Sequence, residues 1–141
     1  MATTAQYTAQ PIIEYAQVTT SDTSLTAPTN SSLVCSGPAV AAANGVGKRI
    51  LRVTIVPTAT TAATTIRFFI SLDNGTTKRL MVEKIVPAVT VTAGTTPAPR
   101  QEVPELVGLV LPGGTGASTV SIYASTSVSA TTNIIVESGT L

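Results

Sequence analysis

Hydrophobic and polar residues alternate in short stretches along most of this chain, and these stretches are rich in Val, Ile and Thr. Each stretch is bounded by Gly, Pro, Asn, Asp, Ser or other small residues. A period of two, carried by β-branched residues between turn residues, predicts β-strands. Eight strands are expected, at residues 12–18, 31–35, 49–56, 65–72, 79–86, 106–111, 119–125 and 132–137.

Helical periodicity is almost absent. No window places apolar residues three and four positions apart between capping residues, and the one helix-tolerant run, residues 39–44, fits a single turn or an irregular loop. Many short strands without helices to cover a sheet leave a sandwich or a barrel as the ways to bury the apolar faces. The sequence therefore predicts an all-β chain of about eight antiparallel strands.

The chain is expected to form a single domain over residues 1–141, a length that suits one hydrophobic core. Residues 1–10 carry one aromatic side chain, Tyr7, among small polar residues and are predicted to be an N-terminal arm. Residues 87–104 contain four prolines among Thr and Ala. Because proline lacks an amide donor, this segment is predicted to be an extended arm or a long loop and not a central strand.

The segment from residue 65 to residue 86 predicts a β-hairpin around Asp73-Asn74-Gly75. A two-residue Asn-Gly turn would place Glu83 opposite Ile66 on the buried face, so a three-residue loop with Gly75 in a left-handed conformation is favoured. That register pairs Phe68 with Leu80 and Ile66 with Val82. The predicted inner face is Ile66, Phe68, Ile70, Leu72, Leu80 and Val82. A second predicted core face is Leu51, Val53 and Ile55.

The outer face of this hairpin carries Phe69, Met81 and Ile85, here called the hairpin patch. An apolar patch with charged groups at its rim has the anatomy of a protein contact surface. Arg67 and Arg79 form part of that rim and, with Tyr7 of the arm, complete the predicted contact residues. The alternative is that a loop of the same chain covers the patch.

Composition argues against an ordinary active site. Charged residues make up only 11% of the chain and the net charge is +1, whereas Thr and Ser number 26 and 12. There is no His, the commonest general base and metal ligand, and one Cys excludes an intrachain disulfide or a thiolate cluster. We expect no enzyme activity, no catalytic or cofactor-binding residues, no metal site and no small-molecule substrate. Cys35 is expected to be a small buried hydrophobe.

The near-zero net charge gives no field that would attract nucleic acid, and neither a nucleic-acid partner nor a membrane partner is expected. The first residues have no basic and apolar regions of a secretory signal, so synthesis in a cytoplasm is expected. Few charges and many Thr and Ser produce a polar but uncharged surface. Such surfaces suit proteins that neighbours cover in an assembly.

Several motifs from the hairpin onward resemble those of a known family. Residues 68–80 read FFISLDNGTTKRL, residues 83–87 read EKIVP, residues 108–114 read GLVLPGG and residues 120–126 read VSIYAST. This order is similar to that of small virion proteins of tailed bacteriophages. In size, composition and layout the chain most resembles capsid cement (decoration) proteins of the jelly-roll kind found in short-tailed Bordetella phages.

The resemblance implies a jelly-roll-like β-sandwich that lies on the outer surface of the virion capsid and bridges subunits of the major capsid protein. It implies association with itself, with a homodimer favoured and a trimer as the alternative, and it brings no catalytic residues. A phage tail, fibre or baseplate component is the alternative function. A carbohydrate-binding sandwich is a third class, although it would lack the Trp side chains on which sugars stack.

Overall fold

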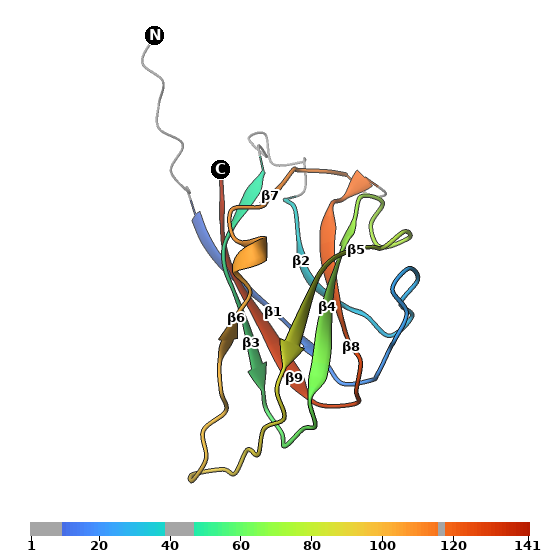
Figure 1. Cartoon of the computed structure of the whole chain (residues 1–141). Helices are drawn as coiled ribbons and strands as arrows, with labels where there is room; N and C mark the ends of the chain where they lie inside the picture. The colour runs from blue at the N-terminus through green and yellow to red at the C-terminus, as the bar shows by residue number, and fades with distance from the viewer. Residues whose placement is uncertain (1–9, 39–46, 116–117) are drawn as a thin grey trace.

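The computed structural model describes residues 10–38, 47–115 and 118–141 (Figure 1). Two of the predicted features lie outside these ranges: residues 1–9 of the predicted arm, which include Tyr7, and the run at residues 39–44. The elements are, in chain order, β1 (Gln10–Val18), β2 (Ser32–Ser36), β3 (Lys48–Pro57), β4 (Thr64–Ser71), β5 (Arg79–Val86), β6 (Gln101–Glu102), the 3-10 turn η1 (Pro104–Leu106), β7 (Val110–Leu111), β8 (Ser121–Thr126) and β9 (Thr132–Thr140). Within the described ranges no helix has the length and hydropathy needed to cross a membrane.

The strands form two antiparallel sheets that pack face to face. The five-stranded sheet has the order β1-β9-β3-β6, with β7 also paired to β3, and the four-stranded sheet has the order β2-β8-β4-β5. Strands pair from the two ends of the chain inward: β1 with β9, β2 with β8, β3 with β6 and β7, and β4 with β5. This long ribbon is rolled up so that β3 also meets β9 and β4 also meets β8, which is a jelly roll. The predicted all-β, jelly-roll-like sandwich is confirmed.

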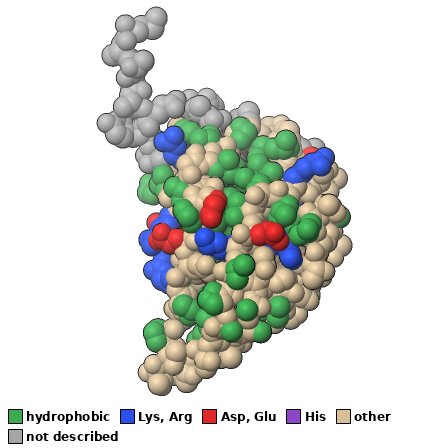
Figure 2. All heavy atoms as spheres, viewed as in Figure 1, with side chains coloured by type: hydrophobic (Ala, Val, Ile, Leu, Met, Phe, Trp, Pro, Cys, Tyr) green, Lys and Arg blue, Asp and Glu red, His purple; other side chains and the backbone are tan. Residues whose placement is uncertain are grey.

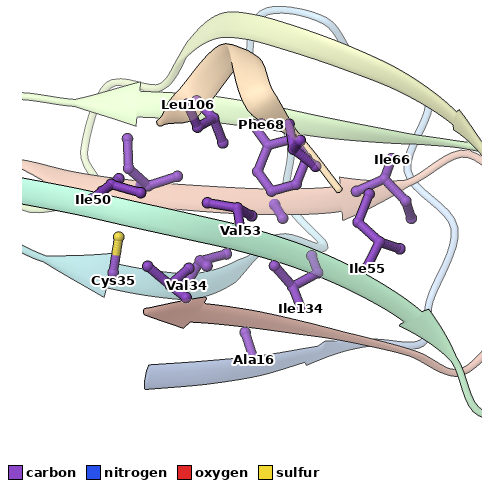
Figure 3. Packing of buried hydrophobic residues seen from close by; sticks show 14 of the residues in the cluster. Ala16, Val34, Cys35, Ile50, Val53, Ile55, Ile66, Phe68, Leu106 and Ile134 are labelled. Carbon is purple, nitrogen blue, oxygen red and sulfur yellow. The ribbon is translucent and has the colours of Figure 1, made fainter. Parts of the chain in front are cut away.

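The hydrophobic core fills the layer between the two sheets (Figure 3). The period of two along each strand directs every second side chain into this layer. Full burial of one such side chain contributes roughly 1.5–3 kcal/mol relative to leaving it in water. The labelled members include Ile50, Val53 and Ile55 from β3, Ile66 and Phe68 from β4, Leu106 from η1 and Ile134 from β9.

A β-bulge in β3 corrects one predicted core position. The register of β3 against β9 shifts between Ile50 and Arg52, so Leu51 has no partner on β9. The extra residue moves the alternation by one step, and Ile50 is buried while Leu51 is exposed. Val53 and Ile55 lie in the core as predicted. The predicted burial of Leu51 is wrong because strict alternation assumes a strand without a bulge.

The β4–β5 hairpin also differs from its predicted register. Phe68 lies opposite Val82 and not Leu80, and Leu80 lies opposite Phe69. A bulge at Met81 causes the shift, because it adds one residue to β5 without a partner on β4. Of the predicted inner face, Ile66 and Phe68 lie in the core and Ile70 and Val82 pack against it, whereas Leu72 is exposed and Leu80 lies opposite Phe69.

The loop of this hairpin is wider than the predicted three residues, because polar side chains hold it together. β4 ends at Ser71 and β5 begins at Arg79. Ser71 Oγ accepts a hydrogen bond from the Gly75 N–H at 2.7 Å, and Asp73 Oδ1 accepts one from the Thr77 N–H at 2.8 Å. Gly75 has a φ of 87°, so its predicted left-handed backbone is confirmed.

Replacing Gly75 with Ala is expected to cost more stability than the same change at Gly94. Both glycines have positive φ, but a Cβ at Gly75 would overlap the Tyr123 hydroxyl, whereas a Cβ at Gly94 meets nothing within 4 Å. We expect the free energy of unfolding, measured by urea denaturation, to fall by about 2 kcal/mol for Gly75→Ala and about 1 kcal/mol for Gly94→Ala. Equal losses would contradict the close packing of the loop against Tyr123.

Residues 106–111, predicted as one continuous strand, are divided by a turn. η1 ends at Leu106, which is buried in the core, and only Val110–Leu111 form β7. Between them Gly108 has a φ of 87° and donates its N–H to the Ile50 carbonyl at 2.8 Å. Positive φ does not fit a strand, so this prediction is wrong. Residues 87–100 connect β5 to β6 and run along the lower end of the molecule in Figure 1.

Candidate contact surfaces

The hairpin patch is divided by burial. Phe69 is fully buried although it lies outside the core between the sheets, whereas Met81 is 37% exposed and Ile85 is 71% exposed. Phe69 therefore cannot contact a partner directly, and the predicted patch loses its largest side chain. The alternative, in which the same chain covers Phe69, is the arrangement observed.

The loop between β1 and β2 lies beside this outer face of the four-stranded sheet. The Asp22 N–H donates to the Thr126 carbonyl at 2.7 Å, and the Asp22 carbonyl accepts a hydrogen bond from Arg67 Nη1 at 3.1 Å. Asp22 also orders the loop, because its carboxylate accepts the N–H groups of Thr29 and Asn30 at 2.7 and 2.8 Å.

The two predicted rim arginines have different roles. Arg67 Nε donates to Glu83 Oε1 at 2.8 Å, and only 13% of the Arg67 side chain is exposed. It is therefore engaged within the chain, between β5 and the β1–β2 loop. Arg79 is exposed at the start of β5. It lines a shallow pocket of about 350 Å³ together with Ile70, Leu72, Asp73 and Thr77.

We expect the protein to lose stability in acid because of two carboxylates, those of Asp22 in the β1–β2 loop and Asp73 in the β4–β5 loop. Hydrogen bonds from backbone N–H groups, led by Asn30 for Asp22 and by Thr77 for Asp73, hold both pKa values below the ordinary value of 3.8. A lowered folded-state pKa contributes stability that is present above the unfolded value and is lost as the pH falls through the folded one. We expect the thermal midpoint of unfolding to fall as the pH is lowered below about 4.

Replacing both residues, as Asp22→Asn with Asp73→Asn, should remove part of this acid dependence while leaving the fold intact. Asparagine cannot titrate, yet its side-chain oxygen can still accept a hydrogen bond. Circular dichroism melting curves between pH 2 and 7 measure the difference. An unchanged slope below pH 4 in the double variant would contradict the assigned role of these two carboxylates.

A partly buried ion pair lies on the inner side of the five-stranded sheet. Lys48 Nζ donates to Glu14 Oε2 at 2.8 Å, and the two side chains are 6% and 28% exposed. Neighbouring Cys35 is buried, as predicted. Burial first, and then the charge of Glu14, raises the pKa of the Cys35 thiol to about 12. The thiol therefore stays protonated at neutral pH and is a poor nucleophile.

On the outer face of the five-stranded sheet, β1 presents two exposed apolar residues that are not among the predicted contacts. On β1, Ile13 is 72% exposed and Tyr15 is 78% exposed. Glu14, the charged residue between them, points to the inner side and pairs with Lys48. The available signal was the alternation along β1, but it also allowed the opposite assignment, with Glu14 in solvent.

No group of three or more His, Cys, Asp or Glu side chains is placed to hold a metal ion in the part of the chain that the structure describes. No protein-family model, curated protein or solved structure matches this chain.

Proposed function

We propose that this protein is a structural virion protein that decorates the outer surface of a tailed-phage capsid and cements it by bridging neighbouring major capsid protein subunits. The resemblance of the C-terminal half to small virion proteins of tailed phages supports the phage context. The jelly-roll fold agrees with the cement proteins that the chain resembles. The proposed partners are the major capsid protein and further copies of this chain.

The observation that carries the proposal is the distribution of exposed apolar side chains. They occur on both sheets and on loops: Ile13, Tyr15, Leu25, Leu33, Leu51, Leu72, Met81, Ile85, Val107 and Val110. Figure 2 shows hydrophobic side chains scattered among a few charged groups over the face it presents. Single exposed apolar residues are ordinary, but a low charge content leaves this surface poorly protected against association. Several shallow contacts suit a protein that adheres to a lattice.

A cement protein acts through many identical attachments and not through one tight pocket. Repeated weak contacts on a symmetric shell add up to strong attachment, because each copy that is bound holds its neighbours within reach of their own sites. Ile85, which is well exposed on β5, and Arg79 at the start of the same strand are the predicted contact residues best placed for such an attachment.

The direct test uses phage heads that lack this protein. Added protein is expected to bind the heads to saturation and to raise the temperature at which they release DNA. Ile85→Lys should weaken binding without changing the melting temperature of the free protein, while Thr23→Lys, which adds the same charge at an exposed polar position on the β1–β2 loop, serves as the control. If heads neither bind the protein nor gain stability from it, the proposal is wrong.

The number of copies per virion separates a cement protein from a tail component. A cement protein is expected in a copy number comparable to that of the major capsid protein, whereas a tail, fibre or baseplate component is expected in only a few copies. Densitometry of purified virion proteins measures this ratio. A low ratio, with the protein absent from isolated heads, would favour the tail alternative.

A further inference from the structure

β1 forms one edge of the five-stranded sheet, because the strand order begins with β1 and places β9 on its other side. Two side-chain hydrogen bonds show which backbone groups face outward. The Gln17 carbonyl accepts from Ser32 Oγ of β2 at 2.8 Å, so it points away from β9, whereas the Ile12 carbonyl accepts from Ser138 Oγ of β9 at 3.5 Å. Backbone direction alternates along a strand. The backbone polar groups of Pro11, Ile13 and Tyr15 therefore face the open edge.

The other long edge strand of the sandwich, β5, is partly covered. Gln101 Nε2 donates to the Ile85 carbonyl at 3.0 Å, and Lys84 of β5 forms an ion pair with Glu105 at 3.5 Å. Of the remaining edge strands, β2 has five residues and β6 and β7 have two each. Among the described strands, β1 thus combines the greatest edge length, nine residues, with outward apolar side chains, and no segment of the described residues covers its first half.

An open, apolar edge strand is a template for pairing with another strand, and natural proteins usually cover, charge or shorten such edges. β1 does carry Pro11 near its start, and its one charged residue, Glu14, points inward to Lys48. Its outward face keeps Ile13 and Tyr15 without a charge between them. The occupant that this edge fits is an antiparallel strand with apolar side chains on the same face, and β1 of another copy meets that description.

We propose that the first half of β1 pairs antiparallel with the same segment of a second copy, around a twofold axis at Ile13. The five-stranded sheets of the two copies then form one continuous sheet. This inference deepens the proposed function by naming the surface through which copies of the protein adhere to one another.

Three observations select the register. Ser32 of β2 lies against the Gln17 carbonyl, so the new ladder has to end before Gln17, which excludes a twofold axis at Tyr15. An axis at Glu14 would set the two Glu14 carboxylates directly opposite each other, and like charges in that position are destabilising. An axis at Ile13 places Glu14 opposite Ile12 of the second copy.

The selected register forms four backbone hydrogen bonds. The two Ile13 residues exchange N–H and carbonyl groups, and each Tyr15 N–H donates to the Pro11 carbonyl of the second copy. Pro11 has no N–H to donate, so the ladder ends there. On the outer face the two Ile13 side chains meet, and each Tyr15 ring lies beside a Pro11 ring.

Sedimentation equilibrium in the absence of any phage particle tests the dimer. At about 0.1 mM the native protein should show twice its chain mass of 14.3 kDa. Ile13→Pro removes the outward N–H without disturbing the β9 ladder, so it should reduce the mass to that of one chain while keeping the β-sheet circular dichroism spectrum. Ile85→Pro, an equally exposed Ile on the other long edge, is the matched control and should remain dimeric. A native monomer, or a dimer that Ile13→Pro leaves intact, would overturn the proposal.

Disulfide trapping tests the register. In the proposed ladder the two Ile13 Cα atoms are about 5.5 Å apart, a distance that a disulfide spans. Ile13→Cys should therefore cross-link to itself under mild oxidation, and Tyr15→Cys should not. The buried Cys35 should not form cross-links. Tyr15→Cys also contains Cys35, so the absence of cross-links in that variant is the control. Cross-linking of Tyr15→Cys alone, or only in a mixture of the two variants, would overturn this register.

These outcomes are independent of capsid attachment. A protein that binds undecorated heads but remains monomeric in solution would leave the proposed function standing and remove the β1 contact. A dimer that is trapped through Ile13→Cys but does not bind heads would do the reverse.

Discussion

Replacing Glu14 with Leu is expected to lower the free energy of unfolding by about 3–5 kcal/mol. The substitution removes the carboxylate that accepts a hydrogen bond from Lys48 Nζ at 2.8 Å. The Lys48 side chain is only 6% exposed, so its ammonium group would remain in the protein interior without this partner. Removing one member of a buried ion pair leaves an uncompensated charge. The free-energy cost of that charge exceeds the stabilisation that the intact pair provided. Chemical denaturation at pH 7 measures the loss.

A second substitution distinguishes the charge effect from a packing effect. Adding Lys48→Met to Glu14→Leu removes the stranded charge, and most of the lost stability should return, because apolar replacement of a whole buried pair is often neutral or favourable. Glu137→Leu, which removes a half-exposed partner of Arg52 at 3.8 Å, is the surface control and should change stability by less than about 1 kcal/mol. If the double variant were no more stable than Glu14→Leu, the loss would have to come from packing.

Phe68→Ala is expected to lower the free energy of unfolding by about 3–5 kcal/mol. Phe68 is fully buried in the layer between the sheets, where Figure 3 shows it among Ile66, Val53 and Leu106. Truncation removes the apolar surface of the ring and leaves a cavity that a sandwich held by seven ladders cannot close fully. Urea denaturation, with the m-value checked for constancy, measures the effect.

Leu72→Ala is the control for this prediction. Leu72 was expected beside Phe68 on the inner face, yet it is exposed, so its truncation should change stability by less than about 0.5 kcal/mol. A large loss at Leu72 together with a small loss at Phe68 would restore the predicted inner face and contradict the observed one.

Strand positions followed from local chemistry and were largely predictable. Alternating β-branched residues between turn residues placed seven of the eight expected strands within a few residues of their observed bounds. The exception was residues 106–111, where Gly108 takes a positive φ and the chain bends so that Leu106 can enter the core. A glycine in an apolar run does not reveal which backbone region it occupies.

Register and burial were less predictable because bulges depend on the partner strand. Leu51 and Met81 are each an extra residue relative to the facing strand, and nothing within their own strands marks them. Alternation places Phe69 on the outer face, which predicts a contact residue. The placement on that face was correct, but Phe69 is fully buried within the chain, and alternation alone does not show whether the same chain or solvent covers an outer face.

The sequence by itself determined that the chain is built from short strands and where most of them lie, because these properties depend on neighbouring residues and on composition. Only the tertiary structure decided that Glu14 faces inward and Ile13 and Tyr15 face outward. Alternation along β1 allows either face to be buried, and the choice depends on Lys48, thirty-four positions away, whose ammonium group compensates the carboxylate. Long-range pairing thus selected which side of β1 is left for contact.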